Sequence, residues 1–491
     1  MTDTPNRSAL IPTGIEGLDE VLRGGLVPNR LYLIEGDPGS GKTTIALQFL
    51  LDGVKRGETC LYVTLSETAE ELRVSAASHG WSLDGIHVLE IIASEETLKP
   101  DSRYTMYHPS EVELAETTNK VLVEAARLKP TRLVFDSLSE LRLLAENPLR
   151  YRRQILALKH HFARQQCTVW FIDDRTGEQR DMHLHSLAHG VISLERAAVE
   201  YGSMRRRLQV GKLRGLAFSE GFHDTIIERG GMRVFPRLIA AEHRTSIASQ
   251  TVKSGIAALD SLLGGGLAKG TSTLIMGPAG TGKSSLATQF VCSAIARGER
   301  AAVYLFDESI ATYIERSSGL GLNVEPIMAS GKLLVRQVEP AEMSPGEFAH
   351  TLREAVEKEK VGTVVIDSLS GYLQATPSER FLTLHLHELL IYLGQQGVTT
   401  LIPITQHGIA GPDLQVPVDA SYLADTVILL RYFEAFGEIR QALSVVKKRT
   451  GRHERQIREL RLSEKGISVG EPLHEFHGIL SGSPQFSGKA L

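Results

Sequence analysis

Residues 13–50 read TGIEGLDEVLRGGLVPNRLYLIEGDPGSGKTTIALQFL, and residues 254–291 repeat this stretch as SGIAALDSLLGGGLAKGTSTLIMGPAGTGKSSLATQFV. The two copies register without a gap at a constant offset of 241 residues, so that Lys42 matches Lys283. A period this long indicates duplicated domains, because solenoids of short repeats have periods of roughly 20–50 residues.

Length and composition are those of a globular protein with more than one domain. The chain has 491 residues, of which 42% are hydrophobic and 23% are charged, and its net charge is −4. These values exclude disorder as the main state and disfavour a generally basic nucleic-acid binder. A polar stretch around residues 240–253 separates the two copies. We therefore expect one domain over residues 1–245 and a second over residues 246–491.

Each half alternates short apolar runs with helical stretches. In the first half, the predicted strands are 30–35, 60–65, 133–136 and 168–172, and the predicted helices are 43–56, 110–128 and 149–165. In the second half, the strands are 272–276, 301–306, 363–367 and 399–405, and the helices are 284–296, 345–357 and 380–395. Apolar strands joined by helices indicate a mostly parallel sheet that is flanked by helices. The predicted fold class is α/β, present twice.

The cysteines and the N-terminus indicate a cytoplasmic setting. Cys60, Cys167 and Cys292 are widely spaced and odd in number, which favours neither a disulfide framework nor a zinc site. The first residues contain no apolar segment of the kind found in signal peptides, and no apolar run is long enough to span a membrane. We expect a cytoplasmic protein with no membrane association.

The motif GxxxxGK[ST] occurs in both halves, each time between a predicted strand and a predicted helix. Its glycines let backbone N–H groups curl around phosphate oxygens, and the following helix adds its positive N-terminal end. The lysine of such a loop reaches the β- and γ-phosphates, and the next hydroxyl ligates Mg²⁺. This pattern predicts ATP and Mg²⁺ as cofactors. The predicted nucleotide-binding residues are Gly36, Gly39, Ser40, Gly41, Lys42, Thr43 and Thr44, and Gly277, Gly280, Thr281, Gly282, Lys283, Ser284 and Ser285.

Acidic residues follow two strands in each half. Asp136 and Asp367 end apolar strands and are each followed by Ser-Leu-Ser, so we expect them to be the second Mg²⁺ anchors beside Thr43 and Ser284.

A second set of acids follows the strand after each P-loop helix. These are Glu67 in the first half and Asp307 and Glu308 in the second. They are predicted to lie at the carboxyl edge of the sheet, where ligands bind in open α/β folds. A carboxylate there could orient or deprotonate an attacking water.

With these features the chain resembles the KaiC family of RecA-like P-loop ATPases. The resemblance covers essentially the whole chain and rests on the tandem layout, the P-loops, the acids and three further segments. Those segments are Lys212-Leu213-Arg214-Gly215, Lys447-Lys448-Arg449 and Ile479-Leu480-Ser481-Gly482-Ser483-Pro484.

The resemblance implies two RecA-like domains that assemble as a double-ring homohexamer, with ATP bound between neighbouring subunits. In this family the first ring mainly hydrolyses ATP, and the second carries autokinase and autophosphatase activity. It further implies that Lys212, Arg214, Lys447 and Arg449 reach a neighbour's γ-phosphate, as an arginine finger does. A KaiB-like protein is a further candidate partner.

The chain departs from the family pattern in three places. Ser66 stands where the family often has the first Glu of an acidic pair. Ser421 and Tyr422 match the family's Ser-Thr phosphoacceptor pair, which leaves Ser421 as the candidate acceptor. The chain stops at Leu491, seven residues after Pro484, so the tail that engages a KaiA-like activator is expected to be missing.

Other interpretations remain in competition with a regulatory ATPase and autokinase. One is a DNA-dependent RecA-like motor, which the acidic balance and the lack of an N-terminal zinc-binding cysteine cluster disfavour. Another is a nucleotide-gated scaffold with very slow turnover. His183, His185 and His189 have no acidic or cysteine partner at metal-ligand spacing, so a surface or interface role is favoured over a metal site.

Overall fold

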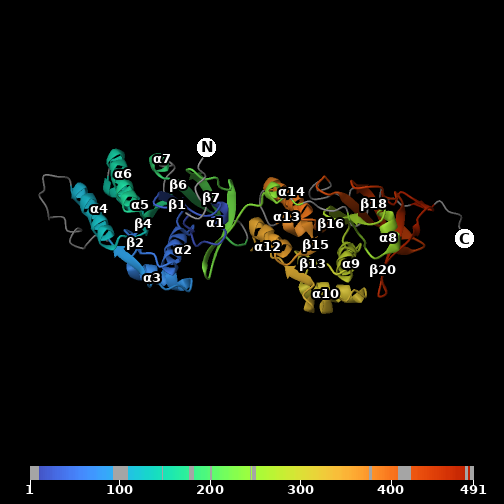
Figure 1. The fold of residues 1–491 in the computed structure, drawn as a ribbon. Helices are drawn as coiled ribbons and strands as arrows, with labels where there is room; N and C mark the ends of the chain where they lie inside the picture. The colour runs from blue at the N-terminus through green and yellow to red at the C-terminus, as the bar shows by residue number, and fades with distance from the viewer. Residues whose placement is uncertain are drawn as a thin grey trace. The chain divides into compact units, whose positions relative to one another are not determined.

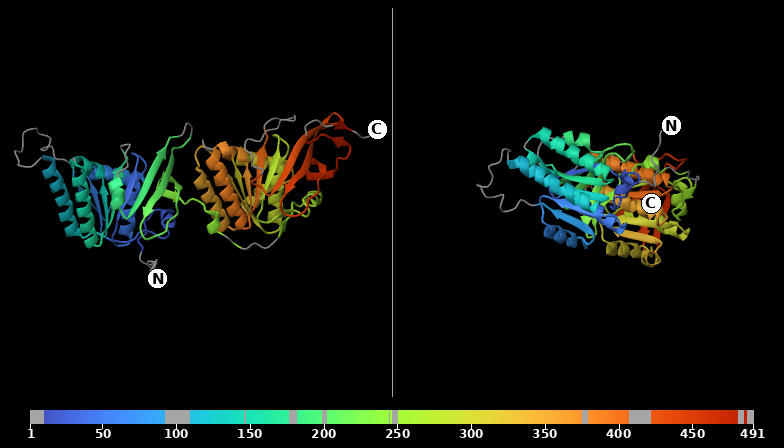
Figure 2. Two further views of the ribbon diagram at one scale, coloured as in Figure 1. Left: turned by 90° about the horizontal axis from the view of Figure 1, so that it is seen from above. Right: turned by 60° about the vertical axis from the view of Figure 1, so that its left-hand side comes forward.

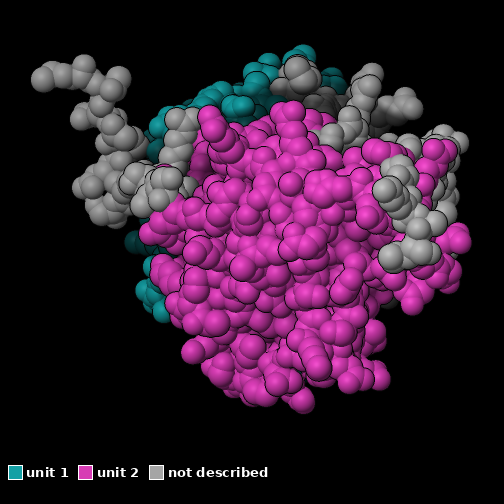
Figure 3. All heavy atoms as spheres, turned by 90° about the vertical axis from the view of Figure 1, so that its right-hand side faces the viewer, with its two compact units in different colours: residues 1–237 teal, residues 238–491 magenta. Residues whose placement is uncertain are grey.

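The computed structural model divides the chain into two compact units, residues 1–237 and residues 238–491 (Figures 1 and 3). It describes residues 10–91, 109–145, 147–175, 182–198, 202–243, 245, 250–374, 379–406, 422–480 and 485–486. Ser421 and residues 481–484 lie outside the described residues, so their predicted roles stay predictions.

The first unit is built on a nine-stranded mixed sheet in the order β3-β2-β4-β5-β1-β6-β7-β8-β9. The strands from β3 to β6 run parallel, and β7, β8 and β9 continue the sheet antiparallel. Their bounds are β1 Leu31–Gly36, β2 Cys60–Thr64, β3 Ile86–Glu90, β4 Arg132–Asp136, β5 Thr168–Asp174, β6 Gly190–Ala197, β7 Arg205–Leu213, β8 Phe222–Glu228 and β9 Gly231–Phe235.

Helices cover both faces of this sheet, with α4, α5 and α6 on one side and α2 and α3 on the other (Figure 1). Along β1, Leu31 and Leu33 belong to the core under α4–α6, whereas Tyr32 and Ile34 belong to the core under α2. Both faces of the strand are therefore apolar. The helices are α1 Leu18–Val21, α2 Lys42–Lys55, α3 Ala69–Ser78, α4 Pro109–Leu128, α5 Leu138–Ala145, α6 Pro148–Arg164 and α7 Met182–Leu187, followed by the 3₁₀ turn η2 Ala240–Glu242 in the second unit.

The second unit repeats this topology in the order β14-β13-β15-β16-β12-β17-β18-β19-β20 (Figure 2). Its strands are β10 Thr251–Val252, β11 Leu267–Ala268, β12 Ser272–Gly277, β13 Arg300–Leu305, β14 Leu333–Gln337, β15 Val361–Asp367, β16 Thr399–Thr405, β17 Thr426–Ala435, β18 Glu438–Lys448, β19 Ile457–Ser463, β20 Gly466–Pro472, β21 Phe476–His477 and β22 Gln485–Phe486. Its helices are α8 Ala257–Leu262, α9 Lys283–Ala296, α10 Ile310–Gly319, α11 Val324–Ala329, α12 Pro345–Glu357, α13 Leu369–Gln374 and α14 Glu379–Gln395. Each predicted strand and helix has a counterpart within a few residues of its expected bounds.

The fold class predicted from the sequence is confirmed, since both units are mostly parallel α/β sheets flanked by helices. The sequence did not predict the antiparallel strands β7 and β8, because these strands are only partly buried and β7 begins with three arginines. Helix α3 was also not predicted from the sequence, although Thr68 and Glu71 form a capping box at its start. Among the described residues, no helix combines the length and apolar character that a membrane crossing requires.

Candidate functional site

The P-loop of each unit joins the central strand to the first long helix, and its backbone requires glycine. Gly39 and Gly41 have φ angles of 73° and 103°, and Gly280 and Gly282 have φ angles of 79° and 93°. Only glycine adopts these left-handed conformations without strain. A Cβ on Gly36 would lie 2.5 Å from the Leu194 carbonyl oxygen, so this position excludes larger residues as well.

The lysines of the two P-loops have different partners. The Lys42 Nζ donates to the carbonyls of Gly36 and Asp37 at 3.0 and 2.9 Å, and it forms a 2.7 Å ion pair with Asp174 at the end of β5. In the second unit Thr405 occupies the strand position of Asp174, because Gly277 pairs with Thr405 as Gly36 pairs with Asp174.

Lys283 therefore has no carboxylate in that place. Its Nζ donates to the Pro278 carbonyl at 2.7 Å. Burial lowers the pKa of Lys283 to about 8, although the charge of Asp367 acts in the opposite direction. The ammonium of the second P-loop is thus less fully compensated than that of the first.

The structure brings each strand-tip aspartate to the hydroxyl predicted to share its metal. Asp136 is hydrogen-bonded to Thr43 and accepts a 2.5 Å hydrogen bond from the Tyr62 hydroxyl. Burial raises the pKa of Asp136, and the hydrogen bonds only partly offset this. A buried carboxylate beside a hydroxyl is an all-oxygen donor set, which fits Mg²⁺.

Asp367 and Ser284 form the corresponding pair in the second unit. Burial, opposed by the hydrogen bond with Ser284 and aided by the nearby charges of Glu308 and Asp307, raises the pKa of Asp367 to about 6. The carboxylate is therefore held in an environment that disfavours its ionised form and that a cation would relieve.

The acids predicted to act on water differ between the units. Glu67 is half-buried, and its pKa is raised by burial and by the charges of Asp136, Glu71 and Asp174. Its backbone is fixed by Thr64, whose hydroxyl donates to the Glu67 carbonyl at 2.6 Å and accepts from the Glu67 N–H at 3.0 Å.

Glu308 is instead bound by a guanidinium. Arg316 of α10 contacts the Glu308 carboxylate at 2.6 Å, and it also donates to the Ser285 hydroxyl at 3.3 Å. The neighbouring acid Asp307 accepts a hydrogen bond from Ser368. At the offset of 241 that relates α3 to α10, Ser75 stands in the place of Arg316.

In each sheet, the Lys-x-Arg segment lies at the end of the strands opposite the P-loop. Gly36 pairs with Leu194 in β6, whereas the Arg214 N–H bonds to the carbonyl of His189, before β6 begins. Five residues of strand correspond to about 16 Å, so Arg214 is remote from the P-loop of its own unit.

The side chains of these segments bind local carbonyls. Lys212 and Arg214 donate to the carbonyls of His185 and Ser186 at 2.5 and 2.8 Å. In the second unit, Lys447 and Arg449 donate to the carbonyls of Ala424 and Tyr422, both at 2.8 Å.

Several residues near the P-loops carry no sequence signal of their own. A Cβ on Gly39 would lie 2.5 Å from the Arg196 guanidinium, and in the second unit the Tyr432 hydroxyl donates to the Ala279 carbonyl at 3.2 Å. Arg196 and Tyr432 come from β6 and β17, which neighbour the P-loop strand only once the sheet has formed. Asp174 and Tyr62 likewise come from other strands, β5 and β2, and Arg316 comes from α10.

The histidines of residues 183–189 do not form a metal site in the described part of the chain. The Nε2 atom of His185 lies 2.8 Å from Glu35, which also binds Arg175 and Ser193 at 2.8 Å each. Burial alone would raise the pKa of Glu35, but the hydrogen bonds from these three partners lower it to about 2. Within the described residues, no group of three histidine, cysteine or acidic side chains could hold a metal ion.

Comparison with known proteins agrees with this geometry. The family model described as "ATPase: KaiC" matches residues 11–239 and again residues 252–474. The chain is 27% identical over 489 residues to the "Circadian clock protein KaiC3" of Synechocystis sp., covering 98% of this chain and 95% of that protein. It is 28% identical to the "Circadian clock oscillator protein KaiC" of Thermostichus vulcanus (96% and 91% covered) and 27% identical to that of Synechococcus elongatus (99% and 94% covered).

The raised pKa of Asp367 predicts that Asp367→Asn stabilises the second unit without nucleotide or metal. An acid whose pKa rises on folding contributes stability below its unfolded pKa, and this stability is lost as pH rises through the folded value. Because the pKa of Asp367 rises from an ordinary value of 3.8 to about 6, the free-energy penalty above pH 7 is about 3 kcal/mol. We expect the variant to unfold at a higher temperature than the native chain at pH 8, with the difference shrinking at pH 5.

Thermal unfolding followed by circular dichroism at both pH values measures this difference. Asp84→Asn, at an exposed acid, is the matched control and should leave the midpoint unchanged. A lower midpoint for Asp367→Asn at pH 8 would contradict the prediction.

Proposed function

Since the chain belongs to the KaiC family of ATPases, we propose that it binds ATP with Mg²⁺ in both units and hydrolyses ATP mainly in the first. This division of hydrolysis rests on the different surroundings of the carboxylates of Glu67 and Glu308. Glu67 has a raised pKa, and α3 has Ser75 at the position of Arg316, whereas Glu308 is held by Arg316.

Nucleotide binding is supported by the two P-loops and the groups around them. The lysines Lys42 and Lys283 supply ammonium groups at the N-terminal ends of α2 and α9. Thr43 with Asp136, and Ser284 with Asp367, would hold Mg²⁺. When bound, the metal neutralises charge that develops on the transferring phosphoryl group.

Hydrolysis in the first unit is assigned to Glu67. A base works best when its pKa is close to the operating pH, and burial and neighbouring carboxylates move the pKa of Glu67 in that direction. Glu67 would orient water and accept its proton. In the second unit, the ion pair with Arg316 fixes the Glu308 carboxylate away from this task.

Assembly as a homohexameric double ring is proposed on the family relationship, and the position of the Lys-x-Arg segments supports it. Because Arg214 is remote from the P-loop of its own unit, its guanidinium would act on the nucleotide of a neighbouring copy. Lys212, Lys447 and Arg449 would serve in the same way, as arginine fingers do in trans. A KaiB-like protein is proposed as a partner on the family relationship alone.

Self-phosphorylation of the second unit on Ser421 is the further part of the proposal. The hydroxyl would have to lie in line with a γ-phosphate held by Lys283 of an adjacent subunit. Tyr422 follows it, and its side chain is 52% exposed. Of the two acids Asp307 and Glu308, Asp307 is the candidate to accept the serine proton, because Glu308 is paired with Arg316.

Substituting each acid separately tests whether ATP is hydrolysed mainly in the first unit. Glu67→Gln should lower steady-state phosphate release at least ten-fold, because general base catalysis typically contributes about 10²–10⁴-fold and only the second unit would remain. In a Lys42→Ala background, Arg316→Ser should raise the remaining release at least two-fold. Glu70→Gln, an exposed acid on α3, is the matched control. Equal losses from Glu67→Gln and Glu308→Gln would contradict the division.

Nucleotide-dependent assembly is tested by light scattering. With ATP and Mg²⁺ we expect the mass of a hexamer, and without nucleotide a smaller species, since ATP would bridge subunits. Arg214→Ala should weaken assembly, whereas the exposed Arg73→Ala should not. A monomer under both conditions would rule out the ring.

Incubation with γ-labelled ATP tests the acceptor. The native chain should take up label, and Ser421→Ala should lose most of it because the receiving oxygen is gone. Ser468→Ala, at an exposed serine of the same unit, is the control. Undiminished uptake by Ser421→Ala would exclude Ser421 as the principal acceptor.

A further inference from the structure

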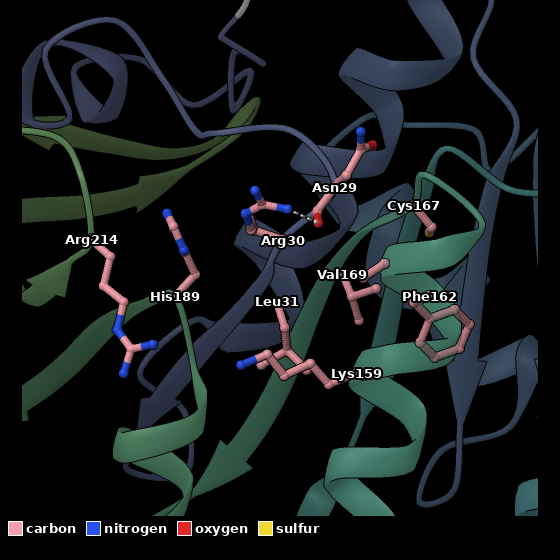
Figure 4. Close-up of a pocket in the computed structure, with 10 residues that line it drawn as sticks. Asn29, Arg30, Leu31, Lys159, Phe162, Cys167, Val169, His189 and Arg214 are labelled. Atoms are coloured by element: carbon pink, nitrogen blue, oxygen red, sulfur yellow. Dashed lines mark hydrogen bonds between the residues drawn. The ribbon is translucent and has the colours of Figure 1, made fainter. Parts of the chain in front are cut away.

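The first unit has a cavity of about 270 Å³ at the end of its strands opposite the P-loop. Its apolar wall includes Leu31 at the start of β1, Phe162 of α6 and Val169 of β5. Figure 4 shows that Arg30, Lys159, His189 and Arg214 also surround it, coming from four separate segments of the chain. The cavity therefore combines an apolar wall with a cationic rim.

The rim cations are held by backbone carbonyls. Lys159 donates to the Leu187 carbonyl at 2.7 Å, Arg214 to that of Ser186 at 2.8 Å, and Arg30 to that of Asn29 at 3.1 Å. Among the described residues, none of these three makes an ion pair with a carboxylate. Their charges consequently remain uncompensated by the protein.

The rim groups also repel one another. Burial lowers the pKa of Lys159, and the charges of Arg214 and Arg30 lower it further. Burial likewise lowers the pKa of His189, with further contributions that include Arg30 and Arg214. The Nε2 atom of His189 is buried without a hydrogen-bond partner in the described structure. An anion in the cavity would relieve the repulsion and could accept a hydrogen bond from this ring.

The second unit lacks this arrangement although its backbone is equivalent. The Arg449 N–H bonds to the Asp425 carbonyl as the Arg214 N–H bonds to His189, so Asp425 matches His189. The Asp425 carboxylate lies 3.6 Å from the Arg449 guanidinium and accepts from the Ser272 N–H at 3.1 Å.

The positions that match Arg30 and Lys159 carry uncharged residues in the second unit. Thr271 matches Arg30 at the offset of 241, and Leu390 matches Lys159, each lying nine residues before the equivalent strands β16 and β5. The cationic cavity is therefore a property of the first unit and not of the fold.

We propose that this cavity binds a phosphomonoester, with the phosphate on the cationic rim and an apolar substituent against Leu31, Phe162 and Val169. The rim supplies the guanidinium groups of Arg30 and Arg214 and the ammonium of Lys159, which are donors that recognise phosphate. This site goes beyond ATP hydrolysis at the P-loop, because it lies at the other edge of the sheet. The phosphate is that of a free small molecule, and a neighbour's nucleotide, on which Arg214 is proposed to act, is the alternative that the experiment tests.

Phenyl phosphate and inorganic phosphate are the probes, titrated calorimetrically at low salt. All titrations use the full chain with Lys42→Ala and Lys283→Ala, so that the P-loops do not contribute. We expect one saturable site in the first unit, at least ten-fold tighter for phenyl phosphate than for phosphate. Exchanging rim residues for their second-unit counterparts, Lys159→Leu or His189→Asp, should weaken binding at least ten-fold.

Arg164→Leu, at the exposed end of α6, is the matched control and should bind like the parent. Arg30→Thr provides a third rim variant, and circular dichroism identifies any variant that fails to fold. Absence of saturable binding, or equal weakening by folded rim and control variants, would overturn the proposal.

Repeating the titration with the native P-loops and ATP-Mg²⁺ distinguishes the sources. Binding of phenyl phosphate that persists on assembly supports the small-molecule site, whereas binding that is lost on assembly leaves the rim to a neighbour's nucleotide and overturns the proposal. If the chain stays monomeric and loses no binding, the site stands while the proposed ring does not.

Discussion

A buried carboxylate held against the hydroxyl of the P-loop is the interaction on which each unit depends. Asp136 meets Thr43, and Asp367 meets Ser284, at a sheet edge where burial disfavours the charge of both acids. Because β5 or β16 lies between the P-loop strand and the strand that ends in the acid, the acid and the hydroxyl meet only once these three strands have paired. Helices on both faces then exclude water from the strands, and the carboxylates remain in a region of low dielectric.

The two units share the same strand order and differ in the charged side chains at equivalent positions. The second unit replaces Asp174 by Thr405 beside the P-loop lysine, and it adds Arg316 where the first unit has Ser75. At the opposite edge, His189 in the first unit corresponds to Asp425 in the second. Since these substitutions leave the strand order unchanged, electrostatics can diverge without a change of fold.

The part of the site that the sequence predicts is the part that is local in the chain. The P-loop, its helix and the strand-tip acids are each encoded within a few residues, and the structure has them at the expected strand and helix ends. The partners Asp174, Arg196 and Tyr62 reach the site from separate strands, so no spacing in the sequence indicates them. Strands β7 and β8 were missed because their partial burial gives a weak apolar pattern.

The different partners of the two P-loop lysines give nucleotide binding a different electrostatic character in each unit. In the first, an incoming phosphate competes with Asp174 for Lys42, so binding exchanges one ion pair for another. In the second, Lys283 has a pKa of about 8 and is partly neutral in mildly alkaline solution. An anion beside it favours the protonated form, so binding is coupled to proton uptake. The residue that ends the neighbouring strand, Asp174 or Thr405, thereby decides whether the P-loop lysine has a carboxylate partner before phosphate binds.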